Sequence, residues 1–325
     1  MGFNDFFAFS KYRVSLLRGM FFLLLLAIGF GTTAWLPSVP VVESEGVNSE
    51  DRAFEALGNW PKNQSPKMPV RLSLADEVVP MKAFGVREQL DRELVANAYR
   101  HGSTMLYMKR AARWFPMIES ILEEHGIPDD FKYLAVIESG LSQVVSPAGA
   151  SGFWQFMKKT APEYGLEVSA SVDERYDVEK STRAACQYLK KSHTRFGNWS
   201  LAAAAYNMGK YGVEKRLDEQ SVDNYWDLHL NSETARYVYR MLAIKEVMSS
   251  PVKYGFHISP ENMYLPHEVR EFEVSENISN LSAFALENGS NLKELKALNP
   301  WLREEYLTVK PGKTYVISLP KIVTE

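Results

Sequence analysis

Apolar residues recur at helical spacing through the middle of the chain, from about residue 86 to about residue 250. The segments VREQLDRELVANAYR, from Val86, and STMLYMKRAARWFPMIESILEEHG, from Ser103, place apolar side chains three and four positions apart. We expect a helix in each, with Pro116 as a kink or boundary in the second, because proline lacks the backbone N–H. Similar spacing in later segments predicts a mainly α-helical domain.

One acidic residue, Glu138, continues an apolar helix face. Phe131 and Leu134 lie seven and four positions before it, and Gly140 is expected to end the helix. Burial and the negative end of the helix dipole both disfavour a charged carboxylate there, so the pKa of Glu138 should be raised. A general acid near neutral pH needs such a pKa, although an incidental buried carboxylate is the alternative.

Small residues at 146–152 predict a loop that a ligand can approach closely. We expect a helix to follow, with Trp154 and Gln155 in its first turns. For Trp154 the residue type fits core packing and sugar stacking equally well, and the Gln155 amide can both donate and accept hydrogen bonds. Asp173 and Asp177 precede another predicted helix, where caps are expected, so a structural role is favoured over a catalytic one.

Two later segments carry polar groups suited to a pocket wall. Tyr206 and Asn207 end a helix rich in alanine and lie beside two glycines. Tyr237 falls in the first turns of a further helix, where its hydroxyl would need a partner if the ring is buried.

Both ends of the chain differ from its middle. Basic residues precede an uncharged stretch at residues 19–36, which predicts an export segment and favours a retained membrane anchor over a cleaved signal. Residues 269–274 alternate like a strand. Two short helices, at 278–288 and at 292–298 with Asn291 as cap, and a strand at 314–319 are expected to follow, a βααβ order. The predicted organisation is an anchor (1–36), an extended linker (37–85), the helical domain (86–250), a connector (251–267) and a small α+β domain (268–325).

Composition and charge disfavour several functions. A formal net charge of −3 with no long Lys/Arg run argues against nucleic-acid binding. The single cysteine, Cys186, excludes an intramolecular disulfide, and its helical context favours a buried structural role over a catalytic thiol. The six histidines show no close ligand pairing, so we expect neither a metal site nor a cofactor.

Four motifs in order carry a family resemblance: Glu138-Ser139, GASGFWQFM from Gly149, AAAYNMG from Ala203 and ETARYV from Glu233. Together they resemble the lytic transglycosylases with a goose-type lysozyme-like fold, and Trp154-Gln155-Phe156 resembles the membrane-bound lytic murein transglycosylase D branch. Ser142-Gln143-Val144 departs from the Asn-Pro-type sequence frequent in that branch. The βααβ segment is similar to the LysM module, with Ser275-Glu276-Asn277 in place of the usual Gly-Asp pair. The implied fold is a lysozyme-like helical catalytic domain plus a LysM-like domain.

The resemblance implies cleavage of the β-1,4 bond between N-acetylmuramic acid and N-acetylglucosamine in peptidoglycan. Glu138 would serve as the single general acid and base, and the muramoyl 6-hydroxyl would attack intramolecularly to leave 1,6-anhydro ends. By motif position, the residues that would shape the sugar cleft are Ser139, Gln155, Tyr206, Asn207 and Tyr237.

Two other functions stay open. A hydrolytic muramidase would use water with the same glutamate, and a non-catalytic scaffold would bind peptidoglycan without cutting it. The expected partners are peptidoglycan strands and the membrane, with protein partners undetermined. The expected location is the bacterial cell envelope, in the periplasm and anchored to the inner membrane, with a cleaved, secreted form as the alternative.

Overall fold

The computed structural model describes residues 65–322, which are mostly helical. The α-helices of the helical domain are α2 (Val86–Tyr99), α3 (His101–Glu124), α4 (Lys132–Ser139), α5 (Val178–Phe196), α6 (Trp199–Met208), α7 (Lys210–Gln220) and α8 (Thr234–Ser249). Short 3₁₀ helices occupy Asp129–Phe131, Ala161–Tyr164, Glu174–Tyr176, Tyr225–Asp227, Pro251–Tyr254 and Pro260–Asn262. The mainly helical domain predicted from the sequence is confirmed.

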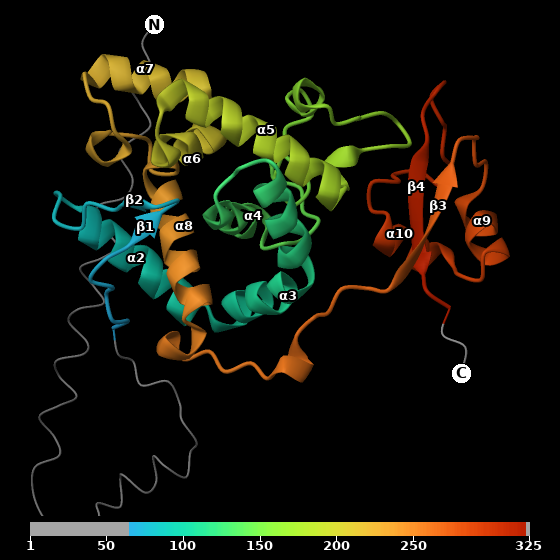
Figure 1. The fold of residues 1–325 in the computed structure, drawn as a ribbon, viewed down its shortest axis with the longest axis horizontal. Helices are drawn as coiled ribbons and strands as arrows, with labels where there is room; N and C mark the ends of the chain where they lie inside the picture. Colours follow the sequence, from blue (N-terminus) through green and yellow to red (C-terminus); the bar gives the residue numbers. More distant parts are fainter. Residues whose placement is uncertain (1–64, 323–325) are drawn as a thin grey trace, which may run out of the picture. The chain divides into compact units, whose positions relative to one another are not determined.

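Helix α4 lies in the middle of this domain, with α3, α5 and α8 around it (Figure 1). It contacts α8 and α3 directly, and Leu134 and Ala135 are fully buried. Four consecutive alanines in α6, from Ala202 to Ala205, are also fully buried, and their small side chains let neighbouring helices approach closely. The eight residues of α4 are therefore held by packing on several sides.

The packed fold begins before residue 86, so the predicted linker ends earlier than expected. Strands β1 (Ser73–Leu74) and β2 (Glu77–Val78) form an antiparallel hairpin, and the apolar side chains around it, Leu72, Leu74 and Val79, belong to the main core. The Glu77 carboxylate accepts hydrogen bonds from the backbone N–H groups of Trp199 (2.5 Å) and Ser200 (3.1 Å). An acidic group at the start of α6 satisfies N–H groups that have no partner within the helix.

Helix α3 runs through Pro116 without ending, so of the predicted kink or boundary the boundary is wrong. The helix buries Met108 and Ala111 before the proline and Ile118, Ile121 and Leu122 after it. The burial of one apolar face along the whole helix offsets the hydrogen bond that proline cannot donate.

The C-terminal module spans residues 269–320 and has the predicted βααβ order. Strand β3 (Val269–Val274) pairs antiparallel with β4 (Tyr315–Pro320), and α9 (Leu281–Glu287) and α10 (Leu292–Leu298) lie between them in the chain. Asn291 caps α10 as expected, because its side chain accepts the Glu294 N–H. Helix α9 begins three residues later than predicted, because Asn280 caps it and Ile278 instead pairs with Leu307.

A loop of the helical domain, residues 167–176, packs against this module. Val172 and Tyr176 belong to the same apolar cluster as Trp301, Leu302 and Tyr315. Backbone hydrogen bonds join Asp173 N to Trp301 O and Arg303 N to Ser171 O, each at 2.9 Å. The module and the helical domain thus share an apolar cluster across the connector, and residues 251–256 of that connector also reach the main core through Tyr254 and Phe256.

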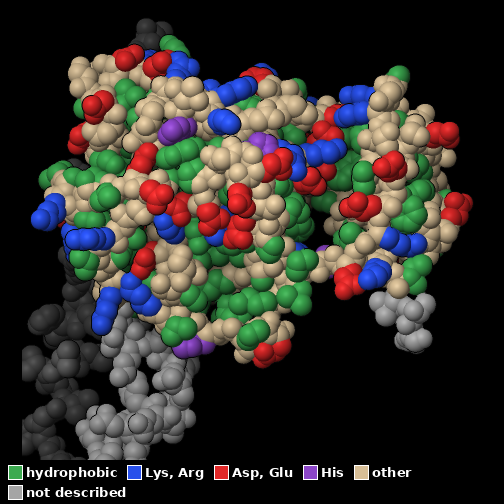
Figure 2. All heavy atoms as spheres, viewed as in Figure 1, with side chains coloured by type: hydrophobic (Ala, Val, Ile, Leu, Met, Phe, Trp, Pro, Cys, Tyr) green, Lys and Arg blue, Asp and Glu red, His purple; other side chains and the backbone are tan. Residues whose placement is uncertain are grey.

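The predicted anchor and most of the predicted linker lie outside the described residues. Among the helices of residues 65–322, none combines the length and the apolar character that a membrane crossing requires. On the face shown in Figure 2, acidic and basic side chains are interspersed over the helical domain.

Candidate active site

Glu138 lies in the last turn of α4, where the sequence predicted it. Phe131 and Leu134, which share its helix face, have no exposed surface. The helix ends at Gly140, whose φ of +61° is left-handed. A Cβ at Gly140 would lie 2.5 Å from the Tyr107 ring, so both the backbone angle and the space require glycine there. These two features fix the point at which the Glu138 side chain leaves the helix.

Glu138 as a whole is half-buried, and protein atoms surround most of its carboxyl group. Burial raises its pKa to about 7, while the hydrogen bond from Tyr237 and the charge of Arg240 oppose the shift and the charge of Glu233 adds to it. The predicted rise in the pKa of Glu138 is confirmed, with burial as its main cause. A carboxyl group with this pKa can both release and accept a proton near neutral pH.

Tyr237 supplies the partner of Glu138. Its hydroxyl donates a hydrogen bond to Oε1 of Glu138, and the residue is only 1% exposed in helix α8. Burial and the neighbouring Glu138 charge hold the pKa of Tyr237 well above its ordinary value. Tyr237 therefore stays protonated and orients one oxygen of Glu138, which leaves Oε2 to carry the acidic proton.

Tyr206 lies near the same carboxyl group. Burial, and then the charge of Glu138, raise the pKa of Tyr206 well above its usual range. Its hydroxyl donates to the backbone carbonyl of Trp154 at 2.8 Å, and its ring makes edge contacts with Phe156 and Tyr188. Tyr206 thus connects α6 to the loop that follows α4.

Asn207 reaches the site through Glu233. Its amide nitrogen donates to Glu233 Oε1 at 3.2 Å, and its amide oxygen accepts from the Thr234 hydroxyl at 2.7 Å. Because the charge of Glu233 acts on the pKa of Glu138, this network lies within electrostatic range of the acid.

The segment around Trp154 and Gln155 is a tight turn, and the helix predicted there was wrong. Isolated bridges join Ser151 to Val145 and to Phe156. A Cβ on Gly152 would lie 1.9 Å from the backbone oxygen of Arg175, so the chain passes a neighbouring segment at a distance that only glycine allows. This tertiary contact overrides the helical pattern of the local sequence.

Trp154 is fully buried, which excludes the sugar-stacking interpretation and confirms core packing. Its indole N–H donates to the Thr182 hydroxyl at 2.8 Å.

Gln155 and Ser139 bond to their own segments. The Gln155 amide donates to the carbonyls of Val144 (3.1 Å) and Gly152 (2.7 Å), and Gln155 itself has a φ of +49°. The Ser139 hydroxyl donates to Ala135 O at 3.0 Å, a bond within α4. Of the predicted site residues, Tyr237, Tyr206 and Asn207 gather around Glu138, whereas these two stabilise the backbone beside it.

Arg175 holds the loop that follows α4 in place. Its Nη1 donates to the carbonyls of Gly149 (3.0 Å) and Phe156 (3.2 Å), and Asp173 holds its guanidinium through a 2.7 Å ion pair. Asp173 and Asp177 also cap the elements that follow them, as expected for a structural role. The Gln143 amide donates to Tyr176 O at 2.7 Å. Gln143, which belongs to the segment that departs from the family pattern, thus connects the chain after α4 to the residue next to Arg175.

Three residues were missed from the sequence: Glu233 and Arg240, whose charges act on Glu138, and Arg175, which holds the loop that follows α4. Glu233 opens one of the quoted motifs, and Arg240 lies three positions after Tyr237 on the same helix face. Helical spacing from Tyr237 could have found Arg240, whereas Arg175 acts through a contact that only the fold creates.

Cys186 is fully buried, and burial raises the pKa of its thiol to about 12, consistent with the structural role that was predicted. Within residues 65–322, no group of three or more His, Cys, Asp or Glu side chains is arranged to hold a metal ion.

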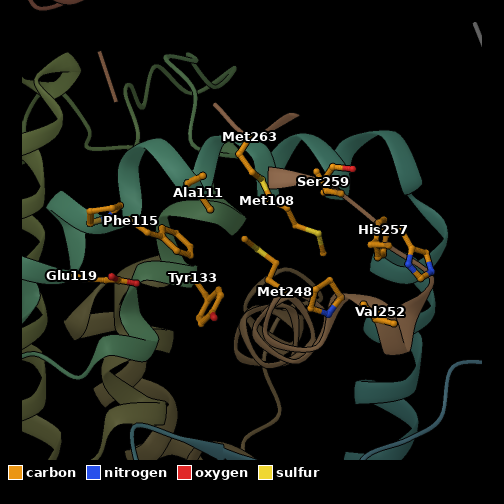
Figure 3. Close-up of a pocket in the computed structure, with 15 residues that line it drawn as sticks. Met108, Ala111, Phe115, Glu119, Tyr133, Met248, Val252, His257, Ser259 and Met263 are labelled. Atoms are coloured by element: carbon orange, nitrogen blue, oxygen red, sulfur yellow. The ribbon is translucent and has the colours of Figure 1, made fainter. Parts of the chain in front are cut away.

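An apolar cavity of about 660 Å³ lies elsewhere, between α3, α8 and the connector (Figure 3). Its lining includes Met108, Phe115, Tyr133 and Met248, and its one acid, Glu119, pairs with Lys132 at 2.7 Å. Because that carboxylate is already paired and none of the predicted site residues lines this cavity, the Glu138 cluster is the better candidate for the active site.

The solved structures that resemble part of the chain include two lytic transglycosylases. The 70 kDa soluble lytic transglycosylase from Escherichia coli has a TM-score of 0.36 and 23% identity, covering 47% of this chain and 26% of that one. An inactive mutant of the lytic transglycosylase Slt from Pseudomonas aeruginosa has a TM-score of 0.35 and 21% identity, covering 55% of this chain and 35% of that one.

The relatives found by sequence comparison include two proteins of different description. Membrane-bound lytic murein transglycosylase D of Escherichia coli (strain K12) is 31% identical over 179 residues, which are 53% of this chain and 39% of that protein. A putative tributyltin chloride resistance protein of Alteromonas sp. (strain M-1) is 33% identical over 116 residues, or 35% of this chain and 56% of that protein. The matched parts thus cover less than two thirds of either relative.

Two family models match separate parts of the chain. The transglycosylase SLT domain matches residues 116–228, which include Glu138, Tyr206 and Asn207. The soluble lytic transglycosylase C-terminal LysM-like domain matches residues 270–322. The chain therefore carries a transglycosylase SLT domain followed by a C-terminal LysM-like domain, and it is homologous to membrane-bound lytic murein transglycosylase D over the matched residues.

Proposed function

We propose that the protein is a lytic transglycosylase that cleaves the β-1,4 bond between N-acetylmuramic acid and N-acetylglucosamine in peptidoglycan. The observation that carries the proposal is the Glu138 carboxyl, which lies within the matched SLT domain and whose pKa burial raises to about 7. The hydroxyl of Tyr237, from helix α8, donates a hydrogen bond to it. The similarity to membrane-bound lytic murein transglycosylase D of Escherichia coli supports the same reaction class.

In this mechanism Glu138 acts twice. Its protonated Oε2 gives a proton to the glycosidic oxygen while the bond to the muramoyl C1 breaks, and the substrate's own N-acetyl group stabilises the positive charge at C1. The resulting Glu138 carboxylate then takes the proton of the muramoyl 6-hydroxyl as that oxygen bonds to C1. Proton and electrons balance without water, and the product ends in a 1,6-anhydro ring.

A hydrolytic muramidase is the second candidate, because a second carboxylate, that of Glu233, lies within electrostatic range of Glu138. An ionised Glu233 could activate a water molecule in place of the 6-hydroxyl. Asn207 already holds one oxygen of Glu233, which favours a positioning role for it over a catalytic one.

Mass analysis of the products from purified peptidoglycan separates these two reactions. A transglycosylase releases anhydro-muropeptides that are one water lighter than hydrolysis products. Products of hydrolytic mass alone would overturn the intramolecular mechanism, and a Glu233→Gln variant that stops hydrolysis would then identify the base.

Replacement of Glu138 tests the acid itself. Glu138→Gln keeps the size of the side chain but cannot donate an acidic proton, so cleavage should fall by about 10²- to 10⁴-fold while glycan binding persists. Glu88→Gln, at an exposed site on α2, is the control and should cleave normally. Equal cleavage by both variants would remove Glu138 from the mechanism. A wild-type protein that binds glycan without cleaving it would instead support a scaffold.

Location and the role of the module are parts of the same proposal. Residues 19–36 would anchor the protein to the inner membrane with the two domains in the periplasm, because eighteen uncharged residues follow a basic segment. Membrane fractionation and N-terminal sequencing distinguish this form from a cleaved, secreted one. The LysM-like domain would bind glycan, and a pull-down of Glu138→Gln with insoluble peptidoglycan, with and without residues 268–325, tests that role.

A further inference from the structure

A second cavity, of about 350 Å³, lies beside the candidate acid and is lined mainly by polar residues. Val136 and Ile137, which immediately precede Glu138 in α4, form part of its wall. The remaining lining comes from α2 and its C-terminal end, from Tyr107 of α3, from α8 and from the residues just before α8. It includes three arginines: Arg100, Arg236 and Arg240. We call this cavity the arginine pocket.

Two of its arginines are fixed in place. Arg236 Nε lies 2.7 Å from Oε1 of Glu93, a carboxylate only 2% exposed, and its Nη2 lies 3.3 Å from Oε2. Arg240 donates from Nη2 to the backbone oxygen of Ile137 at 2.9 Å. These bonds hold the two guanidinium groups in fixed directions before any ligand arrives, which lowers the entropy cost of binding.

The third arginine is open to a ligand. Arg100 is exposed at the end of α2, and among residues 65–322 its side chain has no hydrogen-bond or ion-pair partner. The three arginines outnumber the two carboxylates in the lining, Glu93 and Glu233, and Glu93 is neutralised by its pair with Arg236. The arginine pocket therefore contains hydrogen-bond donors and an excess of positive charge.

We propose that the arginine pocket binds a carboxylate on the substituent of the muramic acid residue. This inference rests on the proposed function. Muramic acid differs from glucosamine by a lactyl ether, which ends in a carboxylate on bare strands and continues into a carboxylate-bearing peptide on substituted ones. Planar guanidinium groups match carboxylates in charge and in geometry. Because the pocket wall continues directly into Glu138, a muramoyl residue at the acid has its substituent within reach of the pocket.

Arg100 is the residue to change, because Arg240 also acts on the pKa of Glu138 and Arg236 compensates a buried charge. Binding is measured in the Glu138→Gln background, so that no turnover occurs. The probes are peptide-bearing strands, strands stripped of peptide by an amidase, and an N-acetylglucosamine oligomer that lacks the lactyl group. Arg87→Gln, another exposed arginine on α2 that does not line the pocket, is the matched control.

We expect Arg100→Gln to weaken binding of carboxylate-bearing strands about tenfold and to leave the oligomer unaffected. Arg100→Lys keeps the positive charge but loses the planar guanidinium group. Its affinity for carboxylate-bearing strands should therefore lie between that of the protein with Arg100 and that of Arg100→Gln. If Arg100→Gln weakens the binding of stripped strands alone, the pocket binds the lactyl carboxylate. If it weakens the binding of peptide-bearing strands alone, the pocket binds a carboxylate of the peptide.

Unchanged binding of both carboxylate-bearing probes, or an equal loss with the neutral oligomer, would overturn the inference. Binding in the Glu138→Gln background does not depend on cleavage. A wild-type protein without transglycosylase products would therefore defeat the proposed function alone, and an insensitive Arg100 would defeat only the arginine pocket.

Discussion

The Tyr237 hydroxyl, on α8, donates a hydrogen bond to Oε1 of Glu138, in the last turn of α4. The two residues are 99 positions apart in the chain, so the bond depends on the packing of α8 against α4. Tyr237 stabilises the ionised form of Glu138 and thus limits the rise in pKa that burial causes. The bond therefore lowers the pH at which Glu138 loses its proton, against the larger effect of burial.

Tyr237→Phe should move the alkaline limb of the pH–activity profile to higher pH. The acid is active when protonated, so activity is present below the Glu138 pKa of about 7 and is lost as the pH rises through it. Removal of the donor raises that pKa. At pH 6 the rate should fall about tenfold, because the carboxyl group loses its orientation. Initial rates from pH 5 to 9 check the shift, and an unchanged alkaline limb would mean that another group controls it.

Glu138→Gln should make the protein more stable at alkaline pH. The folded pKa of Glu138 is raised, so ionisation opposes folding at a pH above about 7, whereas below the unfolded value of about 4.3 the protonated group has no such cost. A shift from 4.5 to about 7 corresponds to at most about 3 to 4 kcal/mol. Urea unfolding at pH 4 and pH 8 should show a gain for the variant at pH 8 only. A similar gain at both values would point to packing instead of charge.

Gly152→Ala should damage the loop beside the acid far more than Gly149→Ala. Both glycines have positive φ angles, but a Cβ at Gly152 would meet Arg175 O at 1.9 Å, while one at Gly149 meets nothing within 4 Å. We expect a loss of more than about 2 kcal/mol in unfolding free energy at Gly152 and about 1 kcal/mol at Gly149. Thermal unfolding and cleavage rates of the two variants test this, and equal losses would contradict the close contact.

Glu167→Gln should loosen the C-terminal module. Burial opposes the charge of Glu167, but hydrogen bonds from Lys313 and Tyr315 and the ion pair with Lys310 prevail and lower its pKa to about 2. A depressed pKa stabilises the fold above the unfolded value of about 4.3, and that contribution is lost as the pH falls toward 2. Because the two lysines are partly exposed and screened by water, we expect a loss of roughly 1 kcal/mol at pH 7.

Glu268→Gln is the control for that experiment. Glu268 pairs with Lys321 at 3.2 Å, but both side chains are largely exposed, so its removal should change stability by less than about 0.5 kcal/mol. Hydrogen exchange of residues 167–176 should rise in the Glu167 variant only. Equal hydrogen-exchange rates in the two variants would show that the contacts of Glu167 with Lys310, Lys313 and Tyr315 do not hold the module.

Features set by nearby residues were predicted well. The helix that carries Glu138, its end at Gly140 and the βααβ order of the module follow from periodicity, caps and glycine, all of which act within a few residues. The raised pKa of Glu138 was predicted for the same reason, because helix periodicity shows which face is buried.

Features set by distant contacts were missed. The turn at Trp154 exists because Gly152 passes against Arg175 O, and the hairpin at residues 73–78 is held where Glu77 meets the start of α6. Neither partner can be inferred from local sequence. Glu233 was overlooked because a charge acts through space, and its distance from Glu138 is known only once α8 is packed against α4. Arg240 could have been found from its helical spacing to Tyr237, but its effect on Glu138 depends on the same packing.

The apolar cluster shared by residues 167–176 and the module affects the order in which the chain can fold during synthesis. Glu167 bonds to Lys313, 146 positions later, and Val172 packs among residues that follow the connector. During synthesis the ribosome delivers those partners long after the helices around Glu138 have emerged. The loop that carries Arg175, and through it the turn beside the acid, can reach its final packing only when the module has folded. We therefore expect nascent chains that stop before the module to leave Val172 and Tyr176 uncovered, as an attachment point for chaperones and proteases.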